Sequence, residues 1–325
     1  MNTQINQYKI EKNTDKKKWD LLLDQSEQYN IFNKTFFLDS IIDKYELYFI
    51  YKGKEIVGGF SVILDFEKKK IISNDYIVHA GIFFLPQRKS NKASYLIEKY
   101  NITNSYVKFL TENYSSIDLT LSPNIEDMRP FLWHNYLSGN KFTINLRYTN
   151  YLNLENFDIE RPFSKNNTKN LNTLRNRNLK EAQKKDISFN FSNDFDKLIS
   201  CHIDNLLGQG KKLKDEQKDR KEIGNIIKNL KKQDKLLLQE TYENNKSKYI
   251  ICFGLDNSTS FFLFGAPSDK NTGNYIGTAS LWNLFKICKK KNIKRCDLEG
   301  INSPQRGWFK LSFGGEIKNY YNVLI

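Results

Sequence analysis

The chain has 325 residues, 39% hydrophobic and 14% aromatic, and its 51 basic side chains outnumber 37 acidic ones to give a net charge of +14. This length suits two domains of roughly 150 residues, and the hydrophobic content excludes a disordered chain. No segment approaches the run of about 20 apolar residues that a membrane-spanning helix needs. The start, residues 1–18, is polar and lysine-rich and lacks the apolar centre of a signal peptide. We therefore expect a soluble, cytoplasmic protein.

The positive charge has two explanations. It favours a phosphate-bearing partner such as a nucleotide, coenzyme A or tRNA. It also fits a chain rich in Lys, Asn, Ile, Phe and Tyr, as AT-rich genomes encode, whose lysines simply coat the surface. The four cysteines are widely spaced and form no C-x-x-C pair, so we expect no metal site and no permanently bound cofactor. Three of the four are expected to be buried thiols.

The first half of the chain begins with a predicted hairpin over residues 46–66, turning at 52–54. An apolar stretch at 76–86 and a helix over 93–113 follow. A strand is expected over 115–122, and then a Trp-bearing strand from Arg129 and a strand-pair region over 141–154.

Two helical regions separate the halves. Residues 164–185 predict a basic helix, and residues 195–235 predict a second, highly charged helical region. Within that region Gly208 and Gly210 indicate a helix end or a turn.

The second half repeats the order of the first. A hairpin over 235–255 and a strand over 258–267 precede a helix over 278–290, which carries Leu281, Leu284, Phe285 and Cys288 on one face. Strands are then expected over 293–300, 306–315 and 316–325. The repeated order predicts an internal duplication, with domains over residues 1–155 and 156–325.

Most familiar catalytic motifs are missing. The sequence has no phosphate-binding glycine motif and no G-x-S-x-G, which weakens kinase, dehydrogenase and hydrolase hypotheses. Of its three histidines, His79 and His134 stand in apolar or aromatic surroundings typical of packed residues.

Two carboxylates mark the strongest candidate site. The two-residue period of a strand places Asp297 and Glu299 on one face, with Cys296 and Leu298 on the other. Their repulsion would raise one pKa toward neutrality, as a general base or a site for a substrate amine requires. Alternatively, they are ordinary surface acids on an exposed edge.

An aromatic, glycine-rich segment follows these carboxylates. Lys310, flanked by Trp308, Phe309 and Phe313, would be partly desolvated and would act strongly on an oxyanion or a phosphate. Alternatively, it is a strand lysine whose stem passes the aromatic rings to reach water. Gly314 and Gly315 allow a bulge or a close backbone approach.

The stretch DLEGINSPQRGWFKLSFGGE, residues 297–316, resembles the C-terminal signature of the FemAB-type transferases and their relatives in the GNAT superfamily. Residues 172–189 and 127–154 resemble further segments of the same family. The resemblance implies an α/β fold of the α+β kind: tandem duplicated GNAT-like domains, each a mixed central sheet flanked by helices. It also implies that Phe309 and Lys310 lie at the centre of acyl transfer.

The candidate residues divide by role. Lys310, Glu299 and Asp297 are the predicted catalytic groups. The residues expected to bind substrate are Phe309, Trp308, Asn302, Arg306, Trp133 and Tyr136. The usual GNAT phosphate loop is reduced to NYIGTAS, so the donor's phosphates are expected at Gly277 and Thr278, with Arg175 and Arg177 as further contacts.

The favoured function is an N-acyltransferase that moves an acyl group from acyl-CoA to an amino sugar or nucleotide-sugar of a surface glycan. The first alternative is an aminoacyl-tRNA-dependent ligase that extends a peptidoglycan precursor, for which the basic helix over 164–185 would suit tRNA. The second is a non-catalytic RNA-binding or scaffold protein. The acyl group, the acceptor and the oligomeric state are not determined by the sequence.

Overall fold

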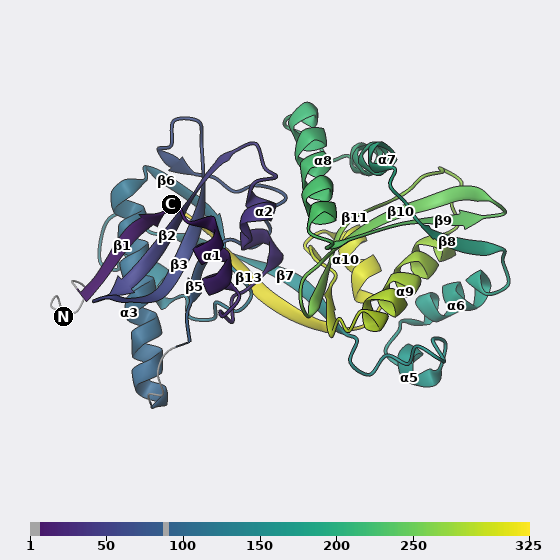
Figure 1. Ribbon diagram of the computed structural model, residues 1–325, viewed down its shortest axis with the longest axis horizontal. Coiled ribbons are helices and arrows are strands. Elements are labelled where there is room, and N and C mark those ends of the chain that lie inside the picture. Colours follow the sequence, from purple (N-terminus) through teal and green to yellow (C-terminus); the bar gives the residue numbers. More distant parts are fainter. Residues whose placement is uncertain (1–6, 87–90) are drawn as a thin grey trace. The chain divides into compact units, whose positions relative to one another are not determined.

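The computed structural model describes residues 7–86 and 91–325, which form two compact units (Figure 1). The first unit comprises residues up to 147 together with 319–325, and the second comprises 148–318. This division differs in two places from the domain boundary expected between residues 155 and 156. Residues 151–153 pair with a strand of the second unit, whereas residues 322–324 pair with a strand of the first.

The first unit contains, in chain order, β1 (Tyr8–Asn13), α1 (Lys16–Leu23), η2 (Ile31–Asn33), α2 (Thr35–Leu38), β2 (Lys44–Lys52), β3 (Glu55–Leu64), β4 (Lys70–Ile71), β5 (Gly81–Phe84), α3 (Lys92–Asn113), β6 (Ser116–Thr120) and α4 (Arg129–Leu132). β7 (Thr143–Asn153) and β13 (Glu316–Leu324) each contribute residues to both units. The strand order is β1-β2-β3-β4-β6-β13, and β5 also pairs with β3.

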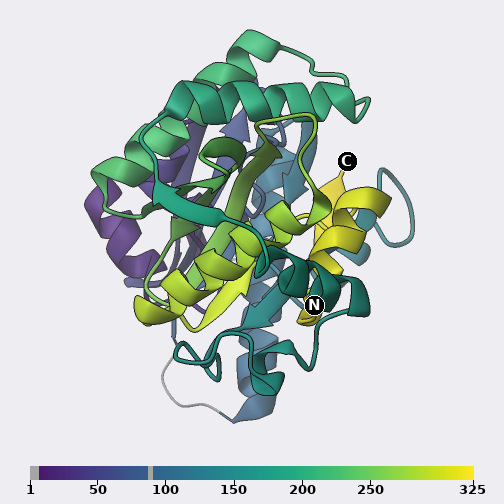
Figure 2. The same ribbon diagram turned by 90° about the vertical axis from the view of Figure 1, so that its right-hand side faces the viewer.

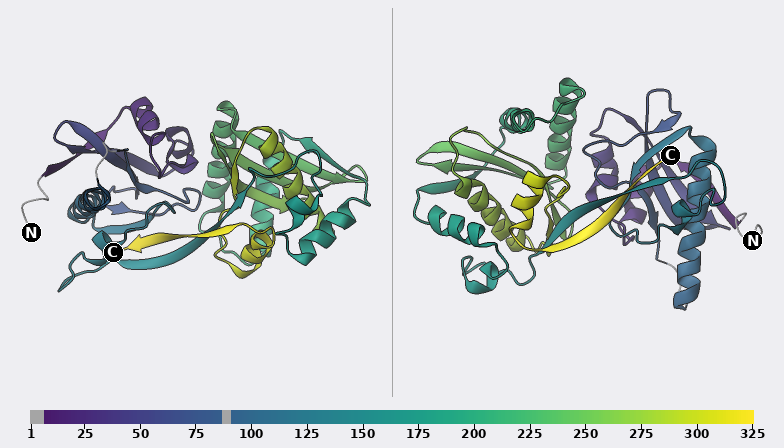
Figure 3. Two further views of the ribbon diagram at one scale, coloured as in Figure 1. Left: turned by 90° about the horizontal axis from the view of Figure 1, so that it is seen from below. Right: turned by 180° about the vertical axis from the view of Figure 1, so that it is seen from behind.

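Helices cover both faces of this first sheet. Neighbouring residues of a strand point to opposite faces, so Tyr48 and Phe49 of β2 face different helices. The Phe49 ring stacks on Trp19 of α1 at 5.8 Å between centroids, and the Tyr48 ring meets Phe109 of α3 at 5.1 Å. Figure 3 shows α3 along one side of these strands. His79 is buried between Phe32 and Tyr320, as predicted for a packed histidine.

The second unit contains, in chain order, α5 (Lys165–Thr168), α6 (Thr173–Ala182), β8 (Ile187–Phe191), α7 (Phe195–Gly208), α8 (Glu216–Lys232), β9 (Leu236–Glu243), β10 (Lys246–Leu255), β11 (Thr259–Pro267), α9 (Asn274–Lys290), β12 (Arg295–Asp297) and α10 (Pro304–Leu311). Its strand order is β7-β12-β11-β10-β9-β8. β11 and β12 run parallel, and the other neighbours are antiparallel.

In this unit α7 and α8 cover one face of the sheet, and α9 with α6 covers the other (Figures 1 and 2). The predicted apolar face of α9, with Leu281, Leu284, Phe285 and Cys288, lies in the hydrophobic core. The two predicted hairpins and the helix end at Gly208 are confirmed. Three cysteines are buried thiols, as expected.

The two halves share the predicted order of elements. In each, a strand and helices lead to a hairpin, to further strands (β4 and β5 in the first half, β11 in the second), and then to a long helix, a short strand, a short helix and a last strand. Several details of the prediction are wrong. The predicted helix over 164–185 is two helices, α5 and α6, and the predicted strand over 293–300 is only β12. The strand pair predicted over 141–154 is the single strand β7, and the strands predicted from Arg129 and Arg306 are instead the helices α4 and α10. Pro130 and Pro304 explain the last error, because proline favours the first turn of a helix.

The described helices include none that is both long and apolar enough to cross a membrane.

The core of the second unit predicts a large effect of one substitution. Phe285 is fully buried between Trp282 and Phe313. Phe285→Ala should lower the free energy of unfolding by about 3–5 kcal/mol, because it leaves a cavity that rigid neighbours cannot fill. Urea unfolding monitored by the fluorescence of Trp282 checks this. Leu207→Ala, at an exposed position of α7, is the control and should cost less than about 0.5 kcal/mol. A loss below about 1 kcal/mol for Phe285→Ala would contradict this packing.

Candidate active site

The site is built where β12 ends. Asp297 is the last residue of the strand, and two residues later Glu299 adopts φ +56°, followed by Gly300 at +31°. A left-handed conformation is uncommon for a residue with a side chain. Asp297 and Glu299 are both buried, which excludes the alternative of ordinary surface acids. The strict strand alternation predicted for residues 296–299 therefore stops at Asp297.

The two carboxyl groups are in different environments. Asp297 Oδ1 accepts hydrogen bonds from the Thr149 hydroxyl, at 2.5 Å, and from the Glu299 N–H, at 2.9 Å. Asp297 Oδ2 and Glu299 Oε1 have no hydrogen-bond partner among the described residues. Burial raises the pKa of Asp297 to about 6, against these hydrogen bonds. Burial, and then the charge of Asp297, raise the pKa of Glu299 well above its usual range. Asp297 is therefore the carboxyl that ionises by neutral pH, and Glu299 holds its proton more strongly than a free carboxyl does.

Lys310 completes the cluster from α10. Its ammonium donates to the backbone carbonyl of Glu299 at 2.8 Å and lies 4.7 Å from the centroid of the Phe262 ring. The side chain is buried, so it is not a strand lysine that reaches into water. Burial lowers the pKa of Lys310 to about 8, although Glu299 and Asp297 oppose the shift. A cation held in so dry a place acts strongly on any charge that forms beside it.

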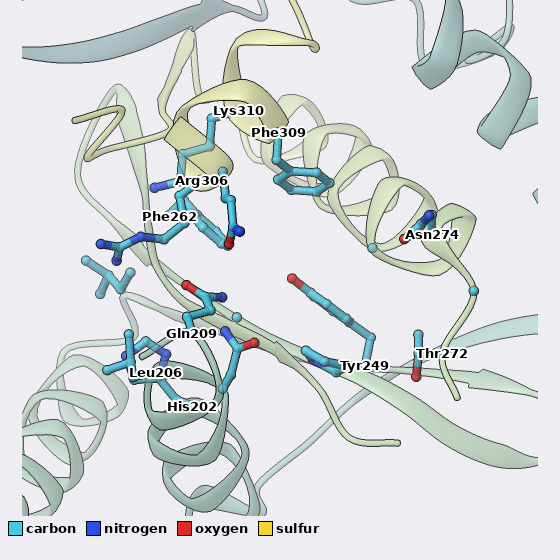
Figure 4. A pocket seen from close by; sticks show the side chains of 17 residues that line it. His202, Leu206, Gln209, Tyr249, Phe262, Thr272, Asn274, Arg306, Phe309 and Lys310 are labelled. Atoms are coloured by element: carbon cyan, nitrogen blue, oxygen red, sulfur yellow. The ribbon is translucent and has the colours of Figure 1, made fainter. Parts of the chain in front are cut away.

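Lys310 also lines a cavity of about 380 Å³ in the second unit (Figure 4). β11 pairs with β12 only over Thr259–Phe261, and its later residues form one wall. The other walls come from α7, β10, the start of α9 and α10. The lining residues are His202, Asn205, Leu206, Gln209, Tyr249, Phe262, Leu263, Gly265, Pro267, Thr272, Gly273, Asn274, Gly277, Gln305, Arg306, Phe309 and Lys310.

One end of the cavity reaches the N-terminus of α9, where Thr272 and Asn274 lie (Figure 4). No side chain caps this 17-residue helix. The free N–H groups and the helix dipole favour an anion there, as the donor's phosphates would require. Gly277, a predicted phosphate contact, lines the cavity at this end, whereas Thr278 is buried and accepts a hydrogen bond from Arg175.

Arg175 has a structural position that differs from the predicted phosphate contact. Its guanidinium lies 4.9 Å from the centroid of the Phe309 ring and donates to the Thr278 hydroxyl, which also accepts from Asn178 at 3.2 Å. These contacts connect α6, α9 and α10. Neither Arg175 nor Thr278 lines the cavity, so both hold Phe309 and the start of α9 in place.

The other predicted residues are dispersed. Phe309 and Arg306 line the cavity. Asn302 instead bonds the backbone of Tyr148, accepting from its N–H at 2.7 Å and donating to its carbonyl at 3.0 Å. Four of the predicted residues have exposed side chains outside this cavity. They are Trp308 and Arg177 in the second unit and Trp133 and Tyr136 in the first.

The sequence interpretation missed the α7 wall. His202, Asn205 and Gln209 follow the spacing i, i+3, i+7, which places them on one side of a helix. A polar stripe at this spacing, beside the apolar residues that pack on the sheet, could have indicated that this helix lines a site. Tyr249 was missed because a tyrosine in a strand gives no sign of which face it lines.

The sequence matches no protein-family model and no curated protein. Among solved structures, FemX has a TM-score of 0.64 at 9% identity, with 96% of each chain covered. A tandem GNAT protein from the clavulanic acid biosynthesis pathway has a TM-score of 0.55 at 9% identity, covering 98% of this chain and 97% of that one. L-PGS from Bacillus licheniformis gives 0.52 at 13%, covering 95% and 91%.

The chain therefore shares the fold of FemX and of the tandem GNAT protein. The resemblance in residues 297–316 predicted this fold, and the element order of each half agrees with it. At these identities the similarity is one of fold, so the roles of the site residues stay predictions.

The raised pKa of Asp297 predicts a dependence of stability on pH. Its folded pKa of about 6 exceeds the unfolded value, so its contribution is fully present below about pH 4 and is lost as pH rises through 6. The Asp297→Asn variant has no carboxyl at this position, so its stability does not fall in this way as the pH rises. The unfolding free energy of the variant relative to the native chain should therefore rise by about 2.4 kcal/mol between pH 4 and pH 7.

Urea unfolding at each pH measures this difference. Asp204→Asn is the matched control, because the side chain is exposed on α7. A difference that stays constant with pH for Asp297→Asn would contradict the burial of an ionisable carboxyl at this position.

Proposed function

We propose that the chain is an N-acyltransferase that moves an acyl group from acyl-CoA to an amine. One observation carries the proposal: Lys310, backed by Asp297 and Glu299, lies in the wall of a cavity that extends to the uncapped N-terminus of α9. The cavity offers an anion site for the donor's phosphates at one end. At the other it offers a dry, charged cluster for the thioester.

The proposed reaction is aminolysis without a covalent enzyme intermediate. The amine attacks the thioester carbonyl carbon, the C–N bond forms, and the C–S bond breaks as the thiolate leaves with coenzyme A and takes a proton from water. Lys310 donates to the oxygen that becomes negative in the tetrahedral intermediate. Asp297 is the proposed final acceptor of the amine proton, because it is the carboxyl that is ionised at neutral pH.

Glu299, predicted beside Asp297 as a base, takes a different role in this proposal. Burial and the charge of Asp297 raise the pKa of its carboxyl well above the usual range, and its backbone carbonyl accepts a hydrogen bond from the ammonium of Lys310. The aromatic rings of Phe309, Tyr249 and Phe262 line the middle of the cavity and exclude water from the thioester. The acceptor is proposed to be an amino sugar or nucleotide-sugar, and the excess of basic residues supports a phosphate-linked one.

A second candidate is an aminoacyl-tRNA-dependent ligase acting on a peptidoglycan precursor. The observation that favours it is a basic surface on α5, α6 and the turn after α6. None of its six exposed side chains forms an ion pair with a described carboxylate: Lys165, Lys169, Arg177, Lys180, Lys184 and Lys185. Such a surface suits the sugar-phosphate backbone of a tRNA.

Binding of the donor separates these candidates. Isothermal titration with coenzyme A should give a dissociation constant in the micromolar range, and deacylated tRNA should bind only weakly and with a steep dependence on salt. Tight tRNA binding without coenzyme A binding would favour the ligase. Absence of both would contradict both transferase hypotheses.

Substitution of Lys310 tests the catalytic step. Lys310→Ala should lower kcat/KM by about 10²–10³, the loss typical of removing one donor to an oxyanion. Release of free coenzyme A thiol from acetyl-CoA, with a panel of amino sugars as acceptors, measures it. Lys232→Ala, on the exposed end of α8, is the matched control. An unchanged rate for Lys310→Ala, with salt-sensitive RNA binding, would instead support the non-catalytic RNA-binding hypothesis.

A further inference from the structure

The cavity differs in character between its two ends. Figure 4 shows Thr272 and Asn274 on one side, Phe309 and Tyr249 in the middle, and His202, Gln209, Arg306 and Lys310 on the opposite side. A donor whose phosphates lie at the start of α9 would extend past the aromatic rings. Its acyl group would then lie among the residues of α7 and α10. This end therefore selects the acyl group.

Charge at the acyl end has one sign. The seventeen lining residues include two cations, Arg306 and Lys310, and no aspartate or glutamate. Arg306 forms no ion pair with any described carboxylate, and its Nε donates to the Ser303 hydroxyl at 3.1 Å. Asp297 and Glu299, whose charges act on Lys310, are buried and do not line the cavity. The lining thus presents the positive charge of Arg306 with no lining carboxylate to pair with it.

The pKa of His202 is affected by these positive charges. Burial lowers its pKa to about 4, and the charges of Lys211, Arg306 and Lys310 lower it further in the same direction. The imidazole is therefore neutral at pH 7, and its Nδ1 has no hydrogen-bond partner among the described residues. An ammonium group placed here would meet the same repulsion that disfavours the imidazolium.

The remaining lining at this end suits a short polar chain. Asn205, Gln209 and Gln305 provide amide N–H donors, and Leu206 and Leu263 provide aliphatic surface. Methylene groups could pack on the leucines while a terminal carboxylate accepts from the amides and from Arg306. A carboxylate and a guanidinium form strong, paired hydrogen bonds.

We propose that the acyl group transferred by this site carries a carboxylate, as in the mono-thioester of a short dicarboxylic acid with coenzyme A, and that an acyl group carrying an ammonium is excluded. The inference rests on the proposed acyl-CoA function and adds to it the chemical class of the donor's acyl group. It also argues against an aminoacyl donor, whose α-ammonium would need a carboxylate that the cavity lining does not provide.

Three inert thioether analogues of coenzyme A test this without knowledge of the acceptor: S-propyl, S-(2-carboxyethyl) and S-(2-aminoethyl). Isothermal titration should give the carboxyethyl analogue at least about tenfold tighter binding than the propyl analogue, and the aminoethyl analogue weaker binding than either. Arg306→Gln should abolish the preference for the carboxyethyl group. Arg220→Gln, at an ion-paired position on α8 outside the cavity, is the matched control and should retain it.

The outcomes separate this inference from the function on which it rests. Equal binding of the three analogues, or tightest binding of the aminoethyl analogue, would overturn the inference while coenzyme A itself still binds. A preference that survives Arg306→Gln would also overturn it. Failure of coenzyme A and of all three analogues to bind would overturn the proposed function and the inference with it.

Discussion

The hydrogen bond from the ammonium of Lys310 to the carbonyl of Glu299 holds the candidate site together. It forms because the chain turns into a left-handed conformation directly after β12, and this turn presents the Glu299 carbonyl to α10. A buried lysine needs such a partner, since an unpaired ammonium in a dry site would lose its proton. With the partner in place, the pKa of Lys310 falls only to about 8, so the cation persists at neutral pH beside the Asp297 carboxylate.

The rest of the second unit arranges this cluster beside a cavity. β11 and β12 pair over only three residues. Beyond them β11 is no longer paired with β12, which leaves room for a ligand on that side of the strand. Arg175 connects Phe309 of α10 to Thr278 of α9, so the helix that carries Lys310 is fixed to the helix whose N-terminus faces the cavity. The same packing that stabilises the fold therefore sets the distance between the N-terminus of α9, the proposed phosphate site, and Lys310, the proposed centre of transfer.

Much of this was predictable from the sequence, and the rest depends on contacts that sequence patterns do not encode. The hairpins, α9 and the repeated order of elements follow from hydrophobic period and turn residues. Lys310 and its two carboxyls were found because they are close together in the chain. Trp308, Phe309 and Phe313 resembled a strand, yet Pro304 begins a helix that buries Lys310 and exposes Trp308. Arg175 was predicted to be a phosphate contact because nothing in the sequence shows that its side chain is buried against Phe309. That contact arises from tertiary packing alone.

If acyl transfer takes place beside Lys310, coenzyme A must bind in this cavity, and a crystal structure of the complex tests this. We expect the phosphates at the start of α9 and the thiol sulfur next to the ammonium of Lys310, between Phe309 and Phe262. Coenzyme A bound outside this cavity, or with its sulfur directed away from Lys310, would contradict this expectation.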